Sequence, residues 1–384
     1  MKKMLFITGT RADFGKMKIL MKEVDNDPHL ECYIYVTGMH MLSRYGYTYD
    51  EVHKAGFNKK NIFVHMNQIA DSNAAMDMIL ANTVQGLGRY IREFRPDLIV
   101  IHGDRVEALA GAIVGALNNI LVAHIEGGEL SGTVDELIRH AITKLVHLHF
   151  VANDEAQKRL IQMGEDENAV FVIGSPDVDI MLSDKLPDIS RIRKYYDIAF
   201  KEYLIFSYHP VTTELDKLQR NIKIIMESLK ESGLNFVVIY PNNDSGSNII
   251  LDTISSLEGN KRFKLFPSLR FEYFLTLLKN AKAIIGNSSA GIRTAPAYGI
   301  PVINIGTRQM NRFNHSSIID VSEDKDVILK SLKNLPQKTA PSLHFGKGNS
   351  AGLFMKHMHQ ESLWATKSQK QFKDLVDAGV KDGQ

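Results

Sequence analysis

Short, uninterrupted runs of apolar residues recur along this chain, and a segment with helical spacing follows most of them. In the first half these runs include Leu5–Thr8, Tyr33–Val36, Leu98–His102, Ile120–His124 and Leu148–Val151. Strands rich in Val, Ile and Leu that lack polar alternation are typical of parallel sheets covered by helices on both faces. Because strand–helix–strand crossovers are right-handed, the pattern predicts an α/β fold with a doubly wound sheet of the Rossmann type.

The same pattern starts again near residue 203, which predicts a second sheet. Its expected strands are Leu204–Ser207, Phe236–Tyr240, Phe263–Phe266, Ala283–Gly286 and Val302–Ile305. A chain of 384 residues also exceeds what a single typical core accommodates. We expect Rossmann-like domains over residues 1–185 and 186–360, a linker within 183–196, and a helix over 361–384 that joins the first domain. Ligands of such sheets bind at the carboxyl ends of the strands, so the site is expected in the cleft between the domains.

The composition narrows the class of partner. The apolar and charged fractions, 44% and 23%, are ordinary for a globular protein. The formal net charge of +2 provides no broad field for nucleic acid or an anionic membrane, so neither is expected as a partner. No stretch reaches the roughly 20 apolar residues of a membrane span, and the apolar run at the N-terminus is too short for a signal peptide. With Cys32 as the single cysteine, these features lead us to expect a cytoplasmic protein.

Carboxylates follow two consecutive strands of the first predicted sheet. Asp104 comes soon after the strand that ends at His102, and Glu126 follows the strand that ends at His124. Converging carboxylates at one sheet edge raise one another's pKa, which suits general acid–base catalysis. Two alternatives stay open: Asp104 caps the next helix, or the alternating histidines and acids bind a metal ion. The spacing matches no zinc or iron pattern, so no metal is expected.

The first turn of the chain has the character of an anion site. It is a glycine turn into a helix, with Arg11 and Lys16 beside a helix N-terminus that favours negative charge. The turn lacks the glycine spacing of a Walker loop, and Met17 replaces its magnesium-binding hydroxyl. A tight turn with two solvated cations is the alternative interpretation.

A second anion site is predicted in the second domain. Ser288, Ser289 and Gly291 lie between a strand and a helix in the form of a phosphate cradle, although a capped helix start is the alternative. Arg308 follows the next strand and adds a guanidinium suited to a diphosphate. His209 precedes a proline, which keeps its backbone extended and places the imidazole at the cleft edge. Anion sites on both domains and acids on one predict an enzyme acting on a diphosphate-linked substrate.

Several longer motifs occur in order through most of the chain: TGTRADFGK, GDRVEALAGA, HIEGGELSGTVDELIRH, FSYHPVTTE, YPNNDSG, GNSSAGIR and NIGTRQMNR. As a set, over roughly residues 1–315, they resemble the hydrolysing UDP-N-acetylglucosamine 2-epimerases of bacterial sialic-acid synthesis. The resemblance implies a GT-B-like arrangement of two Rossmann-like domains. It also implies conversion of UDP-GlcNAc and water to N-acetylmannosamine and UDP, by elimination to a glycal and hydration with inversion at C2. It implies no cofactor, and a homodimer or homotetramer.

The motifs also supply the candidate residues. By the resemblance, Asp104, Glu126 and Asp135 match the catalytic acids, and His209 supports them from the second domain. The substrate-binding candidates drawn from the motifs are Arg11, Lys16, Arg105, Arg139, Asn243, Ser288, Ser289, Gly291, Thr294 and Arg308. Five of these match nucleotide or diphosphate contacts in the family, namely Arg11, Arg105, Ser288, Ser289 and Arg308. Three other acids of the same stretch stay outside the catalytic set: Glu107, Glu129 and Glu136.

One position departs from the family pattern. Members commonly have Glu after the GIR triplet, where it holds the ribose hydroxyls, and Thr294 stands there in this chain. A hydroxyl does not accept two hydrogen bonds in the way a carboxylate does, so we expect weaker ribose binding. Two other classes stay open: a hydrolysing 2-epimerase of UDP- or GDP-linked diacetylbacillosamine, and a GT-B glycosyltransferase or nucleotide-sugar binder. The three acids disfavour a binder, and the first loop differs from the GTRPE of non-hydrolysing epimerases.

Overall fold

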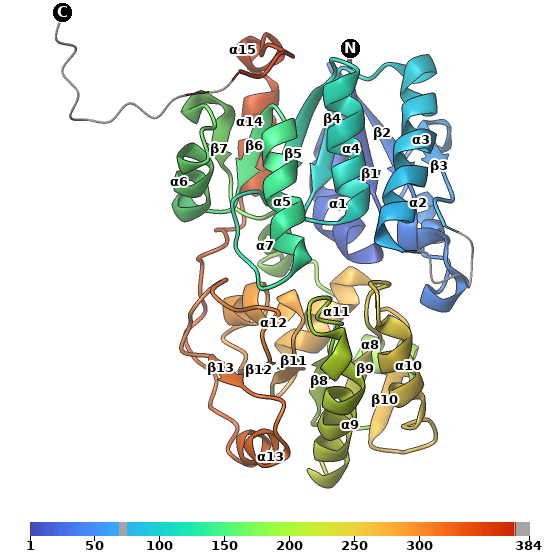
Figure 1. The fold of residues 1–384 in the computed structure, drawn as a ribbon, viewed down its shortest axis with the longest axis vertical. Coiled ribbons are helices and arrows are strands. Elements are labelled where there is room, and N and C mark those ends of the chain that lie inside the picture. Colours follow the sequence, from blue (N-terminus) through green and yellow to red (C-terminus); the bar gives the residue numbers. More distant parts are fainter. Residues whose placement is uncertain (69–74, 372, 374–384) are drawn as a thin grey trace, which may run out of the picture.

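Two lobes are stacked along the long axis of the molecule in the computed structural model, which describes residues 1–68, 75–371 and 373 (Figure 1). The upper lobe contains a parallel sheet with the strand order β3-β2-β1-β4-β5-β6-β7. The lower lobe contains a second parallel sheet with the order β10-β9-β8-β11-β12-β13. In both sheets the direction of winding reverses between the first and the fourth strand, which is the doubly wound arrangement. The prediction of two Rossmann-like α/β lobes is therefore confirmed.

The upper lobe alternates strands and helices along the chain. Its strands are β1 (Lys2–Thr8), β2 (Leu30–Val36), β3 (Ile62–Val64), β4 (Leu98–His102), β5 (Leu121–Ile125), β6 (Leu148–Val151) and β7 (Val170–Val172). Its helices are α1 (Arg11–Asn26), α2 (Tyr49–Lys54), α3 (Met76–Phe94), α4 (Val106–Leu117), α5 (Val134–Leu145), α6 (Asp154–Gln162) and α7 (Pro176–Met181). The edge strand β3 was not predicted, because its three residues form no long apolar run, and two of them are only partly buried while Phe63 is exposed.

The lower lobe repeats this alternation. Its strands are β8 (Leu204–Ser207), β9 (Phe236–Ile239), β10 (Phe263–Phe266), β11 (Ile284–Gly286), β12 (Val302–Ile305) and β13 (Ile318–Val321). Its helices are α8 (Ile189–Tyr196), α9 (Leu215–Glu231), α10 (Ser247–Ser255), α11 (Phe271–Lys279), α12 (Ser289–Arg293) and α13 (Lys325–Lys333). Helix α8 occupies much of the segment predicted as a linker, where the Asp188 side chain caps the helix start.

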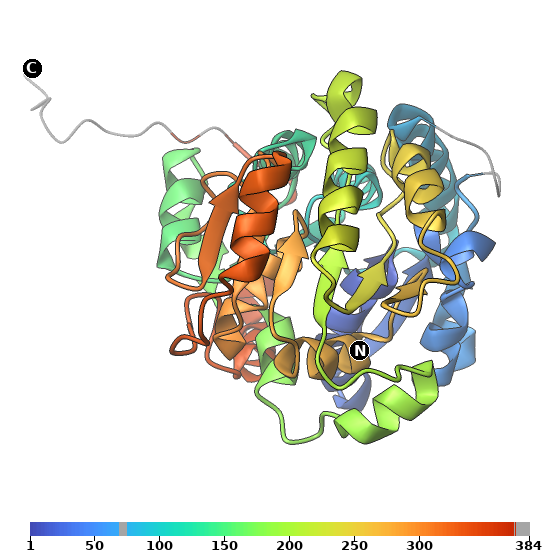
Figure 2. The same ribbon diagram turned by 90° about the horizontal axis from the view of Figure 1, so that it is seen from below.

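Helices cover both faces of each sheet, which explains the lack of polar alternation in the central strands. In the lower lobe, α9, α10 and α13 lie on one face, while α8 and α11 lie on the other (Figure 2). In the upper lobe, α3, α4 and α5 pack on one face and α1 on the other. Every residue of β4 and β5 is buried, so both strands direct apolar side chains into both layers. None of the helices in the described part of the chain combines the length and apolar character needed to span a bilayer.

The C-terminal segment differs from the predicted helix over 361–384. The chain forms α14 (Ser350–Met358) and the short α15 (Glu361–Trp364), and residues 365–371 contain no further helix. The rest of the predicted helix, apart from residue 373, lies outside the described residues. Helix α14 packs against α1 and α7, with Phe354 fully buried in the upper lobe (Figure 1). The apolar residues of α14 therefore make the return to the first lobe, because residues 366–371 are polar and offer no apolar stripe.

Candidate active site

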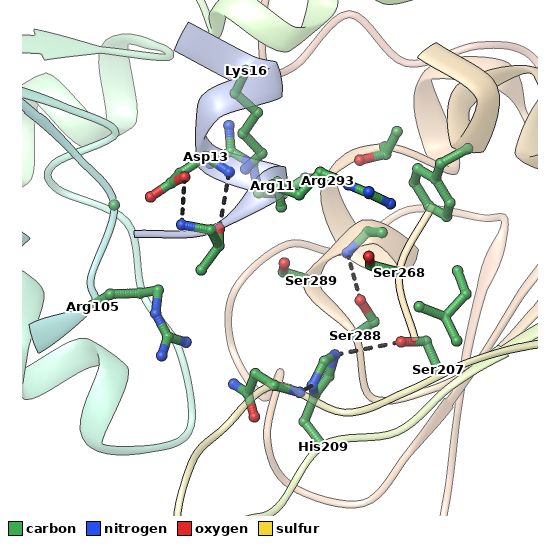
Figure 3. A pocket seen from close by; sticks show the side chains of 18 of the residues that line it. Arg11, Asp13, Lys16, Arg105, Ser207, His209, Ser268, Ser288, Ser289 and Arg293 are labelled. Atoms are coloured by element: carbon green, nitrogen blue, oxygen red, sulfur yellow. Dashed lines mark hydrogen bonds between the residues drawn. The ribbon is translucent and has the colours of Figure 1, made fainter. Parts of the chain in front are cut away.

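A cavity of about 300 Å³ lies between the lobes, where both sets of strands end (Figure 3). This volume is typical of the smaller small-molecule sites. The upper lobe lines it with residues that follow β1, β2, β4 and β5, and the lower lobe with residues that follow β8, β9, β10, β11 and β12. Most of the predicted site residues are among its lining: Arg11, Lys16, Asp104, Arg105, Glu126, Asp135, His209, Ser288, Ser289, Thr294 and Arg308.

Three predicted substrate-binding residues lie behind this lining. Arg139 is fully buried on α5 and pairs with Asp104. Asn243 accepts a hydrogen bond from Arg105, so it contacts a lining residue. Gly291 faces the sheet, where an added Cβ would lie 3.0 Å from Val302. In this structure these three residues support neighbouring elements and do not face the cavity.

The loop after β1 contains its own anion. The Asp13 carboxylate accepts hydrogen bonds from the backbone N–H groups of Gly9 at 3.0 Å, Thr10 at 2.9 Å and Phe14 at 2.6 Å. The Thr10 hydroxyl accepts a hydrogen bond from the backbone N–H of Asp13 at 3.1 Å, which completes a capping box at the start of α1. The backbone donors predicted to hold a substrate anion here are thus already satisfied by the protein, while the basic side chains of the loop still line the cavity.

Glu126 is the most enclosed of the predicted acids. It follows β5 with a left-handed backbone, φ 75°, which is uncommon for a residue with a side chain and typical of strained functional positions. One carboxylate oxygen lies 2.7 Å from His102 Nε2 and 3.2 Å from Lys16 Nζ. The other lies 2.6 Å from Arg293 Nη1 and 3.3 Å from Arg312 Nη2. Burial alone would raise the pKa of Glu126, but Arg293, Lys16 and His102 together hold it well below its usual value. The predicted rise of this pKa through a neighbouring carboxylate is therefore wrong, because cations surround Glu126.

The two other predicted acids are each paired with an arginine. Asp104 forms an ion pair with Arg139 and does not cap α4, whose N-cap position is Arg105 without a capping side-chain bond. Asp135 lies in the first turn of α5 and contacts Arg308 of the lower lobe, with 2.7 Å between carboxylate oxygen and Nη2. Burial would lower the pKa of Arg139, but Asp104 raises it, so this guanidinium stays charged.

His209 presents a neutral imidazole from the lower lobe. Its backbone is held by Asn287, whose side chain accepts from His209 N at 2.7 Å and donates to His209 O at 2.9 Å. The backbone N–H of Asn242 donates to Nδ1 at 3.0 Å, which leaves the ring proton on Nε2 (Figure 3). Burial, followed by Arg308 and Arg105, lowers the pKa of His209 well below its usual value. The ring is therefore a neutral hydrogen-bond donor at Nε2.

The turn after β11 combines small residues with a close backbone approach. Gly286 has a φ of 131°, and an added Cβ would lie 2.0 Å from the carbonyl oxygen of Ser207, so only glycine fits. Ser288 caps α12 by accepting a bond from Ala290 N at 3.3 Å, and Ser289 follows it at the cavity wall (Figure 3). The predicted cradle and the alternative of a capped helix are thus the same structure, because one serine caps the helix while both line the cavity.

Sequence reasoning missed several members of the site. Arg293 and Arg312 are buried, and their guanidinium groups contact Glu126. Both residues belong to the sequence motifs but were not among the predicted site residues. His102 was considered as a metal ligand and instead lies against Glu126, while His124 Nε2 lies 2.7 Å from the carbonyl oxygen of Gly103. The described residues contain no group of three or more His, Cys, Asp and Glu side chains placed to hold a metal ion.

Two Rossmann-like lobes with a cavity between their strand ends define a GT-B-like α/β protein. The sequence profile of the family described as UDP-N-acetylglucosamine 2-epimerase matches residues 22–359. The UDP-N-acetylglucosamine 2-epimerase of Neisseria meningitidis serogroup B is 46% identical over 98% of this chain and 100% of its own length. The hydrolysing UDP-N,N'-diacetylbacillosamine 2-epimerase of Legionella pneumophila is 33% identical over 88% and 89% of the two chains. This chain belongs to the UDP-N-acetylglucosamine 2-epimerase family.

Solved structures agree on the fold. The UDP-GlcNAc 2-epimerase of Methanocaldococcus jannaschii, solved with UDP-GlcNAc and UDP, superposes with a TM-score of 0.77 at 20% identity, covering 93% of this chain and 99% of that one. A UDP-GlcNAc 2-epimerase from Neisseria meningitidis, bound to UDP-GlcNAc, gives a TM-score of 0.75 at 20% identity and the same coverage. At this level of identity the likeness establishes the two-lobed architecture.

Proposed function

We propose that this protein is a hydrolysing UDP-N-acetylglucosamine 2-epimerase, which converts UDP-GlcNAc and water to N-acetylmannosamine and UDP for sialic-acid synthesis. The observation that carries the proposal is the lining of the cavity. The three candidate acids lie on the upper lobe beside Asp13 and three cations, and they face hydroxyls, guanidinium groups and a neutral imidazole on the lower lobe. The 46% identity to the Neisseria meningitidis epimerase over nearly the whole chain supports the substrate. We further propose a cytoplasmic homodimer or homotetramer that needs no cofactor.

The chemistry needs acids beside C2 of the sugar and cations beside the diphosphate. In the first step a carboxylate of the upper lobe removes the C2 proton while the C1–O bond breaks, and UDP leaves with the bonding electrons. The resulting glycal has a double bond between C1 and C2. Water then adds its hydroxyl to C1, and a second carboxylate returns a proton to C2 on the opposite face. The three candidate acids are Asp104, Glu126 and Asp135.

The lower lobe stabilises the leaving group in this proposal. Arg308 is the cation best placed for the diphosphate, and Ser288 and Ser289 supply hydroxyl donors at the start of α12. The Nε2–H of His209 donates a hydrogen bond to the same group without adding charge. When the diphosphate binds Arg308, Asp135 loses its ion-pair partner and becomes available for proton transfer. Substrate binding and activation of one acid are thereby linked.

Incubation with UDP-GlcNAc, followed by proton NMR of the anomeric region, tests the proposal. The expected products are N-acetylmannosamine and free UDP. UDP-N-acetylmannosamine as the product would instead indicate a non-hydrolysing epimerase, and no reaction would contradict the proposed substrate.

A second substrate is favoured by specific relatives. Hydrolysing diacetylbacillosamine 2-epimerases of Legionella pneumophila and Campylobacter jejuni are 33% and 34% identical to this chain. A parallel incubation with UDP- and GDP-linked diacetylbacillosamine tests this alternative. We expect kcat/KM for UDP-GlcNAc to be the larger, and a larger value for either bacillosamine would reassign the sugar.

A further inference from the structure

Glu129 is a buried carboxylate that lies behind the cavity and outside the predicted catalytic set. It follows Glu126 by three residues in the loop after β5, and its side chain is 4% exposed. A buried carboxylate costs much free energy unless cations compensate it. Its partners therefore indicate what it does.

The Glu129 side chain shares both of its cations with Glu126. Arg293 Nη1 forms an ion pair with one Glu129 oxygen, and Arg312 Nη2 lies 2.9 Å from the other. The same two guanidinium groups contact Glu126. Both arginines come from the lower lobe, so two carboxylates of the upper lobe divide two cations between them.

The Glu129 backbone supports a second predicted acid. Its carbonyl oxygen accepts a hydrogen bond from Arg139 Nη1 at 2.9 Å, and the other end of that guanidinium pairs with Asp104. Gly128 fixes the loop, because an added Cβ there would lie 2.4 Å from the backbone oxygen of Ala156. One residue thus contacts the cations of two acids.

The balance of charge around Glu126 depends on Glu129. Lys16, Arg293 and Arg312 carry three positive charges onto this pair of carboxylates. Without the charge of Glu129, Glu126 would be the remaining direct ion-pair partner of Arg293 and Arg312 among the described residues, in addition to its pair with Lys16. A carboxylate surrounded in that way holds its negative charge too strongly to accept a proton readily.

We propose that Glu129 is a positioning residue, whose carboxylate sets the basicity of Glu126 by sharing the guanidinium groups of Arg293 and Arg312. The inference rests on the proposed function, because it concerns the acids that transfer protons at C2. Glu129 itself does not line the cavity, so its effect is on the acids and not on the substrate.

The variant Glu129→Gln tests this proposal, after wild-type turnover of UDP-GlcNAc has tested the proposed function separately. We expect kcat to fall by about 10- to 100-fold, since a weaker base loses much of the rate that general base catalysis supplies. We expect KM to stay within about threefold, because no substrate contact is removed. With UDP-GlcNAc deuterated at C2, the isotope effect on kcat should rise, because proton removal becomes more rate-limiting. A kcat within about threefold of wild type, or a lower kcat with an unchanged isotope effect, would overturn the proposal.

Two further variants separate this role from a structural one. Glu136→Gln serves as the matched control, because it removes the carboxylate of a nearby residue in α5 that is 34% exposed and keeps an acceptor for the backbone N–H of Ser131. This variant should leave kcat unchanged. The double variant Glu129→Gln/Arg312→Gln removes one charge of each sign, so kcat should recover by at least about fivefold over the single variant. No recovery would contradict the charge balance. If both Glu129 variants fail to fold, the residue serves folding and the proposal is wrong.

Discussion

The strands β4 and β11 occupy the same position in their sheets, yet the residues that follow them have opposite chemistry. After β4 comes Asp104, a carboxylate, and after β11 comes Ser288, a neutral hydroxyl that caps a helix start. The first strands also differ, since the helix start after β1 carries Asp13 together with Arg11 and Lys16, and the loop after β8 carries His209. The fold repeats, and the chemistry is set by which side chains stand at equivalent strand ends.

This difference teaches how one cavity can hold acids and an anion site together. Acids on the upper lobe are compensated by cations of the lower lobe, as Asp135 is by Arg308 and Glu126 by Arg293. In the reverse direction, Arg105 of the upper lobe lies 3.6 Å from Asp244 of the lower lobe. Ion pairs between the lobes therefore supplement those within the upper lobe, such as Asp104 with Arg139.

Removing the acids of the upper lobe should have the largest effect. We expect Asp104→Asn and Glu126→Gln each to lower kcat by about 100- to 10,000-fold, because each removes a proton-transfer group. Steady-state kinetics with UDP-GlcNAc measures the loss, and thermal unfolding shows whether the variants fold. Values within about tenfold of wild type for both would show that these acids do not transfer the proton.

The two helix starts offer a sharper comparison. Replacing Ser288 and Ser289 together by Ala should weaken UDP binding by about 10- to 100-fold, since two hydrogen bonds to a charged group are lost. Asp13→Ala should instead lower the free energy of unfolding by about 1–2 kcal/mol through the lost cap, with UDP affinity almost unchanged. Calorimetric titration with UDP and chemical unfolding measure the two effects. If Asp13→Ala weakened UDP binding and the double serine variant did not, the diphosphate would lie on the upper lobe.

The smallest expected effect is at Thr294. This buried residue is the C-cap of α12 and lines the cavity. We expect Thr294→Glu to lower KM for UDP-GlcNAc by about three- to tenfold through new ribose hydrogen bonds, with kcat little changed. Equal KM values for the two proteins would show that other groups already hold the ribose.

The parts of the site that parallel topology dictates could be predicted from the sequence. Asp104 and Glu126 follow adjacent buried strands, so their convergence needs only the strand order. Ser288 and Arg308 follow adjacent strands of the other sheet for the same reason. These strands could be recognised because they are buried on both faces and therefore continuously apolar.

The rest depends on contacts between segments far apart in the chain. Arg293 and Glu126 meet only because the lobes are packed together, and nothing local in the sequence indicates that burial. The capping of α1 by Asp13 is local, but an aspartate at that position is equally compatible with a solvated side chain. The helix that returns to the upper lobe was predicted too far along the chain. This helix, α14, is short, and the packing of Phe354 on the upper lobe decides where it lies.

The fate of the C2 hydrogen tests the central claim most directly. The reaction is run in D2O with ordinary UDP-GlcNAc, and the N-acetylmannosamine is examined by NMR and mass spectrometry. If carboxylates of the upper lobe remove the C2 proton and return another to the opposite face, the product carries one solvent deuterium at C2. N-acetylmannosamine that retains its original hydrogen at C2 would contradict proton transfer by these acids.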